Sequence, residues 1–469
     1  MFKHIVSNWS HHILSIVVML VLAPMMLDEA GLGKPVVGIW VTIVAATGFI
    51  ELLAMGVPMA SVRHISEAVV AGDLDRTNRM ISTGFGITLG VGLLGLVLGG
   101  VLFFPFEAGL LENPKWLEVP PEVLHSAKIA YVITAIRVAA SLSLRFPLAV
   151  FHSKHAFTTS NMILNAGLLF RLFAVIALLK TTPTLSGLAW IFVIEAVGVF
   201  LALRFFIQQS FEGLKMGLAS FDRSLVRGLL GFGLIAAVLN VGTMVAYNID
   251  ALVIGNLIDP DAVADFDVGN KFFLPLASIM YGIGAVVMPT STQLKQDEGL
   301  QVLGPVFLKW SKVSLSIIMP VCLYLTILGP RFLDAWIADP LQNYELSAGP
   351  VTRVLAPSFL LALPLRAVAL PILLGTSSPG RPAAVYLALA FANLVLSVMF
   401  VKAGYGIVGV AFGTAIPQVL FAVYLLLLTC KELKLSPLHW IRYVCGRASV
   451  GMLPCLALLL WLERSLDVH

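Results

Sequence analysis

Arginines within apolar stretches are the residues of this sequence that could do chemistry. The stretch 134-TAIRVAASLSLRFP-147 carries two of them, although a charge near the centre of a bilayer costs at least about 2.5–3.5 kcal/mol. In a helix, the spacing i, i+3, i+7, i+11 places four polar residues on one face: Thr134, Arg137, Ser141 and Arg145. Because lipid does not solvate such a stripe, we expect it to face a wet cavity or a partner helix.

Two more arginines lie in other apolar stretches. Arg366 stands between Pro364 and Pro371, and Arg171 lies earlier in the chain. Buried cations in excess of nearby acids predict an anionic ligand, and a planar guanidinium suits phosphate because it binds two oxygens at once. We expect Arg137 and Arg366 to line a transport path. The alternative for Arg145 and Arg171 is that they lie near the inner surface and extend their head groups to water.

Acidic residues also occur in the apolar stretches, namely Glu51, Glu195 and Asp250. Internal pairing is the structural alternative for such groups. Asp267 and Lys271 are expected to form a local pair of this kind, because residues i and i+4 are neighbours on a helix.

Other motifs do not predict catalysis, a metal or a cofactor. The match of 90-GVGLLG-95 to a nucleotide-binding loop has no strand before it and lies in an apolar stretch. His152 and His155 share a helical face but have no third ligand nearby. The four cysteines form no CxxC pair: Cys322, Cys430, Cys445 and Cys455.

Composition determines the class of protein that must position these residues. The chain has 469 residues, of which 59% are hydrophobic and 12% charged, whereas soluble domains have roughly 25% charged residues. A chain with so few charged residues is expected to be a polytopic membrane protein. The net charge of +4 does not indicate nucleic acid as a partner, because the basic residues fall in short loops where they set topology.

A membrane-spanning helix needs about 20 apolar residues, and this criterion predicts about thirteen spans, with twelve to fourteen compatible. The predicted spans are 10–27, 37–60, 80–104, 127–150, 160–180, 184–207, 228–249, 262–288, 311–329, 350–374, 383–402, 407–429 and 448–462. Lysine and arginine concentrate in alternate loops, which predicts a cytoplasmic N-terminus.

The longest inner loop, 208–227, divides the chain near its middle. LGKPVVGIW at 32–40 is similar to IDPDAVADF at 258–266, and an internal duplication of this kind is typical of secondary transporters. We therefore predict an N-terminal six-helix lobe at 1–213, a C-terminal six-helix lobe at 214–430 and an extra C-terminal helix at 431–469, with the pseudo-repeated lobes around a central cavity.

Several stretches carry a family resemblance. The segment 32–83, with Gly38 and Trp40 entering a span, Gly56 near its end and Arg63 soon after, resembles the opening of polysaccharide-biosynthesis flippases. These are the O-antigen-type lipid-linked oligosaccharide transporters of the multidrug/oligosaccharidyl-lipid/polysaccharide exporter superfamily. The second half is similar too, at NIDALVIGNLIDPDAVADF (248–266), MPTSTQL (288–294) and GPRFLDAWIA (329–338).

The resemblance implies an all-α transporter of about twelve to fourteen helices that works by alternating access. It would flip a polyprenyl-pyrophosphate-linked oligosaccharide from the inner to the outer leaflet of a bacterial cytoplasmic membrane. Its partners would be that substrate, the bilayer, and a polymerase and other glycan-assembly proteins. The arginines would bind the pyrophosphate, and a cation gradient could act through Glu51, Asp250 or Glu195.

Two other functions stay open. A multidrug or organic-cation exporter of the same fold should have an acidic cavity, against which the excess of arginines argues. A membrane enzyme, such as a polysaccharide polymerase or glycosyltransferase, usually carries a large outer loop with catalytic groups. The short loops here favour a transporter that is not an enzyme.

Overall fold

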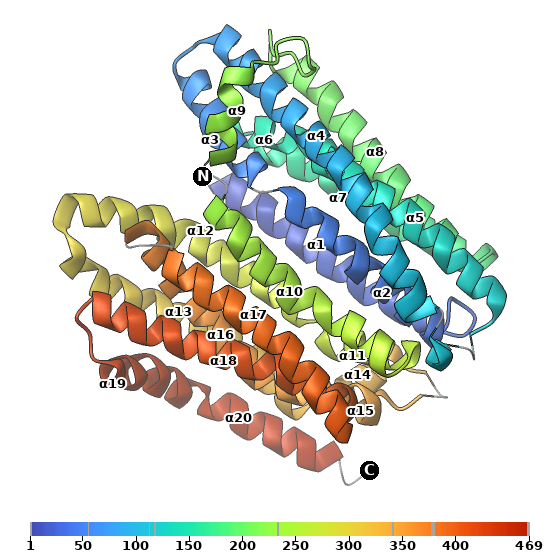
Figure 1. Cartoon of the computed structure of the whole chain (residues 1–469). Coiled ribbons are helices and arrows are strands. Elements are labelled where there is room, and N and C mark those ends of the chain that lie inside the picture. The colour runs from blue at the N-terminus through green and yellow to red at the C-terminus, as the bar shows by residue number, and fades with distance from the viewer. Residues whose placement is uncertain are drawn as a thin grey trace. The chain divides into compact units, whose positions relative to one another are not determined.

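The computed structural model describes residues 2–54, 56–111, 113–116, 119–231, 234–339, 342–376 and 380–466. These residues form helices joined by short turns, and no strand occurs among them (Figure 1). The prediction of an all-α polytopic membrane fold is therefore confirmed.

The chain forms two compact units. Unit 1 comprises Met1–Met244 with Ile258–Ala264, and unit 2 comprises Val245–Leu257 with Asp265–His469. The predicted lobe boundaries at residues 213 and 430 stay predictions. Two helices contribute residues to both units: α10 (Leu234–Leu257) and α11 (Pro260–Asn270).

Unit 1 is built on long helices that pack side by side. α5 packs against α4 and α8, and α7 packs against α1 and α8. Its elements are α1 (Phe2–Leu27), α2 (Lys34–Gly48), η1 (Phe49–Ala54), α3 (Val57–Val70), α4 (Leu74–Phe106), η2 (Glu107–Leu111), η3 (Pro114–Trp116), α5 (Pro121–Leu144), α6 (Pro147–Ser153), α7 (Phe157–Thr181), α8 (Leu185–Ser210) and α9 (Arg223–Gly231).

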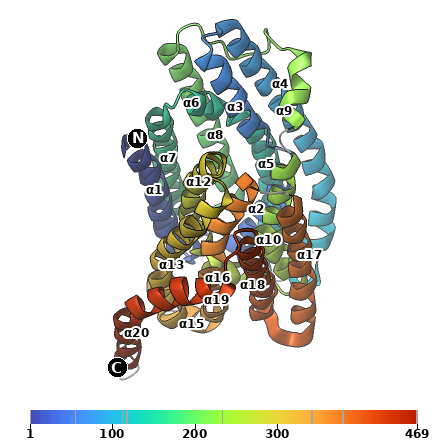
Figure 2. The same cartoon turned by 90° about the vertical axis from the view of Figure 1, so that its left-hand side faces the viewer.

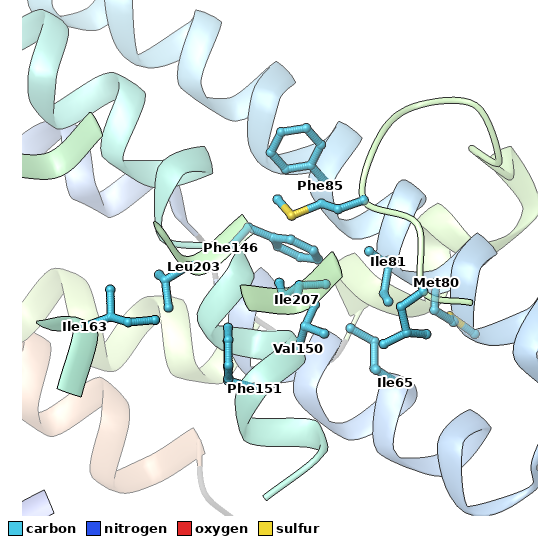
Figure 3. Close-up of a cluster of buried hydrophobic side chains, with 12 residues drawn as sticks. Ile65, Met80, Ile81, Phe85, Phe146, Val150, Phe151, Ile163, Leu203 and Ile207 are labelled. Carbon is cyan, nitrogen blue, oxygen red and sulfur yellow. The ribbon is translucent and has the colours of Figure 1, made fainter. Parts of the chain in front are cut away.

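Small residues and one proline shape the packing around α5. A Cβ on Gly92 of α4 would lie 2.9 Å from the carbonyl oxygen of Ala139, so only glycine allows this approach of α4 to α5. Pro147 lacks an N–H group, and its fixed φ suits a first helical position. Accordingly, α5 ends at Leu144 and α6 starts at Pro147. α6 inserts into a buried cluster (Figure 3), whose labelled members are Ile65, Met80, Ile81, Phe85, Phe146, Val150, Phe151, Ile163, Leu203 and Ile207.

The loop that follows α8 is hydrogen-bonded to α4 within unit 1. The side-chain amide of Asn78 donates to the carbonyl oxygen of Gly213 (3.0 Å), and its oxygen accepts from the Lys215 N–H (2.8 Å). Further along, the hydroxyl oxygen of Thr83 accepts from the Asp222 N–H (2.9 Å). Residues 213–222 are therefore anchored to α4 at two places.

Unit 2 is organised around α16, which packs against α12, α13 and α18. Figure 2 shows α16 between α13 and α18. The elements of this unit are α12 (Phe273–Glu298), η4 (Leu300–Val302), α13 (Leu303–Ile327), α14 (Gly329–Ile337), α15 (Tyr344–Ser347), α16 (Gly349–Thr376), α17 (Gly380–Phe400), η5 (Val401–Tyr405), α18 (Gly406–Glu432), α19 (Pro437–Trp440), η6 (Ile441–Gly446) and α20 (Arg447–Leu466).

Eleven helical stretches within the described residues are long and apolar enough to cross a membrane. The predicted count of thirteen is not confirmed. Two predicted spans, 383–402 and 407–429, fall within one continuous stretch of 53 residues, Gly380–Glu432. The chain turns inside this stretch at Gly404, whose φ is 90°, and α17 packs along α18. A third, the predicted span 228–249, overlaps the shorter apolar helix Val241–Leu257.

Candidate functional site

The polar stripe of α5 runs from a buried end to an exposed end. Thr134 and Ser141 are buried, Arg137 is half-buried, and Arg145 is exposed at the C-terminal cap of the helix. Ser141 donates its hydroxyl to the carbonyl oxygen of Val138 at 2.7 Å. By contrast, neither the Thr134 hydroxyl nor Nε of Arg137 has a hydrogen-bond partner among the described residues. Two polar groups of the stripe therefore make no hydrogen bond to any described residue.

Two of the predicted arginines meet on one aromatic ring of unit 1. The guanidinium carbon of Arg137 lies 5.6 Å from the ring centroid of Phe192 on α8, and that of Arg171 on α7 lies 4.5 Å from it. A cation is attracted to the face of such a ring. The ring also lies against Trp40 of α2, at 5.5 Å between centroids. Side chains from α2, α5, α7 and α8 therefore converge at Phe192.

The Glu195 carboxylate holds Arg171 in place. Nε of Arg171 donates to Oε2 at 2.5 Å, and Nη2 donates to Oε1 at 2.7 Å. This two-bond geometry is the strong form of an arginine–carboxylate pair. Two of the predicted site residues thus neutralise each other, and the pair holds the Arg171 guanidinium near the ring of Phe192.

The charges that act on Arg137 are those of Arg145, Arg171, Glu51 and Glu195. With Arg171 paired to Glu195, Arg137 and Arg145 stand against the single carboxylate of Glu51, which is half-buried in η1. The balance around Arg137 is therefore positive. We refer to Arg137, Arg145 and Arg171 as the arginine cluster, and its net charge suits an anion.

Arg366 lies in unit 2, within α16. It is 6% exposed and donates from Nη2 to the hydroxyl oxygen of Tyr386 at 2.9 Å. Its guanidinium carbon lies 4.7 Å from the Tyr386 ring centroid and 5.5 Å from that of Tyr281. Two tyrosines, from α17 and α12, thus hold the guanidinium in an aromatic setting.

Asp250 of α10 begins a buried hydrogen-bonded chain in unit 2. The carboxylate is 2% exposed, and its Oδ2 accepts from the Thr414 hydroxyl at 2.7 Å. The Thr414 oxygen in turn accepts from the Asn393 amide at 3.3 Å, and Ser397 donates to Asn393 Oδ1 at 3.0 Å. Oδ1 of Asp250 has no hydrogen-bond partner among the described residues. A carboxylate oxygen in this setting can take up a proton or a cation.

The described residues contain no group of three or more histidine, cysteine or acidic side chains that could hold a metal ion. The hydrogen-bonded chain that begins at Asp250 consists of hydroxyl and amide side chains. Sequence reasoning did not identify Phe192, Tyr386 or Thr414. Phe192 precedes Glu195 by one helical turn and lies on the same helix face. This spacing could have pointed to Phe192, but one more apolar residue does not stand out in an apolar helix.

Comparison with known structures identifies the fold. An inward-facing multidrug resistance MATE family transporter of the MOP superfamily superposes with a TM-score of 0.68 and 15% identity, covering 89% of this chain and 98% of that one. The lipid II flippase MurJ, in an inward closed conformation, matches with a TM-score of 0.68 and 14% identity over 100% and 99% of the two chains. A MOP superfamily transporter from Pyrococcus furiosus Vc1 (DSM3638) gives 0.62 and 15%, over 92% and 96%. At these identities the likeness establishes the fold.

Comparison with curated protein sequences finds no significant match. The profile of one family, described as "Polysaccharide biosynthesis protein", matches residues 65–342. The matched segment includes Arg137, Arg171 and Asp250, whereas Arg366 lies beyond it. Because the match extends over more than half of the sequence, the chain belongs to the polysaccharide biosynthesis protein family.

Proposed function

We propose that the chain is a flippase that moves a polyprenyl-diphosphate-linked oligosaccharide from the inner to the outer leaflet by alternating access. Membership of the polysaccharide biosynthesis protein family supports this function, as does the fold shared with a structure described as a lipid II flippase. The observation that carries the proposal is the half-buried Arg137, whose Nε has no hydrogen-bond partner among the described residues.

The arginine cluster supplies what a diphosphate requires. A buried donor without a partner is unfavourable, so Arg137 gains most from a ligand that brings its own acceptor oxygens. Arg145 adds a second cation, whereas Glu195 occupies Arg171. We assign Arg137 and Arg145 to direct contact with the diphosphate, and Arg171 to orienting Phe192. The buried Thr134 and Ser141 extend this polar face of α5.

Arg366 is proposed as a second anion contact, in unit 2. Its Tyr386 and Tyr281 neighbours stabilise the cation without introducing a carboxylate of their own. Asp250, with its buried Oδ1, is the proposed coupling group for a proton or another cation. Glu51 is a second candidate for coupling, and Glu195 a third whose carboxylate must first leave Arg171.

The setting of the protein follows from the same function. It is a multi-pass membrane protein, and we place it in a bacterial cytoplasmic membrane with a cytoplasmic N-terminus. The lobes 1–213 and 214–430 would move during transport, with 431–469 as an added helix. A polymerase and other glycan-assembly proteins would use the delivered oligosaccharide. The chain itself would transport without catalysing a covalent step.

Transport in proteoliposomes tests the proposal. Purified protein is reconstituted with a lipid-linked diphosphate oligosaccharide, and the appearance of the sugar on the opposite face is measured. Loss of a hydrogen bond to a charged group corresponds to roughly 10- to 150-fold, so Arg137→Ala should lower transport by at least tenfold. Arg137→Lys should restore little, because lysine is a point charge without a planar fork.

A matched control removes a cation outside the cluster. Lys180 is exposed in the last turn of α7, and Lys180→Ala should transport like the unmodified protein. Equal transport by the two alanine variants would contradict the assignment of Arg137. An organic-cation exporter of the same fold would instead bind lipophilic cations, and competition by such a cation with wild-type activity in Arg137→Ala would favour that function.

A further inference from the structure

Basic side chains from separate elements of unit 2 gather on the ring of Tyr443 in η6. The guanidinium carbon of Arg447, at the start of α20, lies 4.2 Å from the ring centroid, and Nζ of Lys312 on α13 lies 5.6 Å from it. The His439 ring of α19 stacks on Tyr443 at 5.9 Å with an interplanar angle of 19°. α13 packs against both η6 and α20, so this meeting is part of the tertiary packing.

Among the described residues, no acidic partner accounts for the convergence of Lys312 and Arg447. Neither Lys312 nor Arg447 forms an ion pair with any described residue. Two like charges held against one ring repel each other, and the ring face offsets that repulsion only in part. A bound anion that contacts both Lys312 and Arg447 would be attracted to each of them and would offset their mutual repulsion.

The depth of these residues identifies where the anion comes from. Tyr443 and Arg447 are the seventh and eleventh residues of the 30-residue span candidate Pro437–Leu466, and Lys312 is the thirteenth of the 28 residues of Leu300–Ile327. Trp440 of the same span candidate as Tyr443 stacks on Phe307 at 6.3 Å. Long basic side chains inside a span extend their charged ends toward the head groups, where aromatic side chains also gather. Lys309 precedes Lys312 by one helical turn and Arg442 adjoins Tyr443, and both are exposed and add to the positive field.

We propose that Lys312, His439, Tyr443 and Arg447, here called the Tyr443 cluster, bind the phosphate of an anionic bilayer lipid of the phosphatidylglycerol type. Basic residues that only set membrane topology would have no reason to converge on one ring from three elements. A phosphate fits because its oxygens accept from an ammonium and a guanidinium at the same time. The site is separate from the arginine cluster of unit 1 and does not depend on which substrate is transported.

Lipid retention by the full-length protein tests the proposal. The purified protein in detergent is titrated with phosphatidylglycerol or with zwitterionic phosphatidylethanolamine, and bound lipid is counted by native mass spectrometry. Each basic group lost near an anionic surface weakens binding about fivefold, so Lys312→Gln with Arg447→Gln should weaken phosphatidylglycerol binding about 30-fold. Phosphatidylethanolamine binding should not change.

Two further variants separate a lipid site from a general charge effect. The double variant Arg381→Gln with Lys402→Gln removes two exposed cations of unit 2 that lie outside the cluster, and it should retain phosphatidylglycerol. Tyr443→Phe keeps the ring and should retain the lipid, whereas Tyr443→Leu should lose it. Equal phosphatidylglycerol retention by the cluster variant and the control variant would overturn the proposal. Loss of a polyprenyl diphosphate with unchanged phosphatidylglycerol binding would overturn it as well.

Discussion

The pair between Arg171 and Glu195 allows a quantitative test of how the arginine cluster is held. We consider Arg171→Gln, Glu195→Gln and the double variant. The pair makes two charge-assisted hydrogen bonds, of 2.5 and 2.7 Å, and the side chains are 28% and 10% exposed. Partial exposure lowers the contribution of each bond below that of a fully buried pair, so a coupling energy of about 2 kcal/mol is expected from the double-mutant cycle.

The assay is denaturant-induced unfolding of the purified variants in mild detergent. A second cycle on Lys128 and Glu107, also in unit 1, is the control. That pair makes one contact at 2.6 Å with side chains 39% and 27% exposed, and exposed pairs contribute about 0.2–1 kcal/mol. If the two cycles give the same coupling energy, the two-bond pairing of Arg171 does not hold the cluster, and our account of Phe192 is wrong.

Two other predictions concern acidic groups. Asp222 lies in the loop outside the spans, and hydrogen bonds from the Ser224 hydroxyl and N–H hold the pKa of its carboxyl below the ordinary value. The stabilisation that its carboxylate gives to the turn at Ser224 is therefore present above about pH 4 and lost as the pH falls through the lower folded pKa. Amide hydrogen exchange of Ser224, corrected for the intrinsic pH dependence of exchange, should speed up there, and Asp222→Asn should remove this effect. Asp250→Asn should leave diphosphate binding intact while abolishing the dependence of transport on a cation gradient, measured in proteoliposomes with and without that gradient, and a retained gradient dependence would exclude Asp250 as the coupling group.

Helical periodicity predicts local features of this chain, and the site itself stays a prediction. The stripe from Thr134 to Arg145 follows from the 3.6-residue repeat alone, and the ion pair of Asp267 with Lys271 is confirmed. The pairing of Arg171 with Glu195 could not be predicted, because the two residues lie on different helices, 24 positions apart. Local spacing carries no information on which face of α8 meets α7.

The break between two of the predicted spans could be read from the sequence. The spans 383–402 and 407–429 were separated there, and the chain turns at Gly404 with a φ of 90°, which glycine adopts readily. The partners of Asp250 could not be read in this way, since Asn393 and Thr414 are isolated polar residues within apolar helices.

The anchored loop of unit 1 has a consequence for how its length can vary. Surface loops usually tolerate inserted or deleted residues. Here Asn78 fixes Gly213 and Lys215, and Thr83 fixes Asp222, so the residues between the two anchors must cover a set separation along α4. An insertion between Lys215 and Asp222 would have to bulge outward, and a deletion would break one anchor. We therefore expect relatives that keep Asn78 and Thr83 to keep the length of this loop as well.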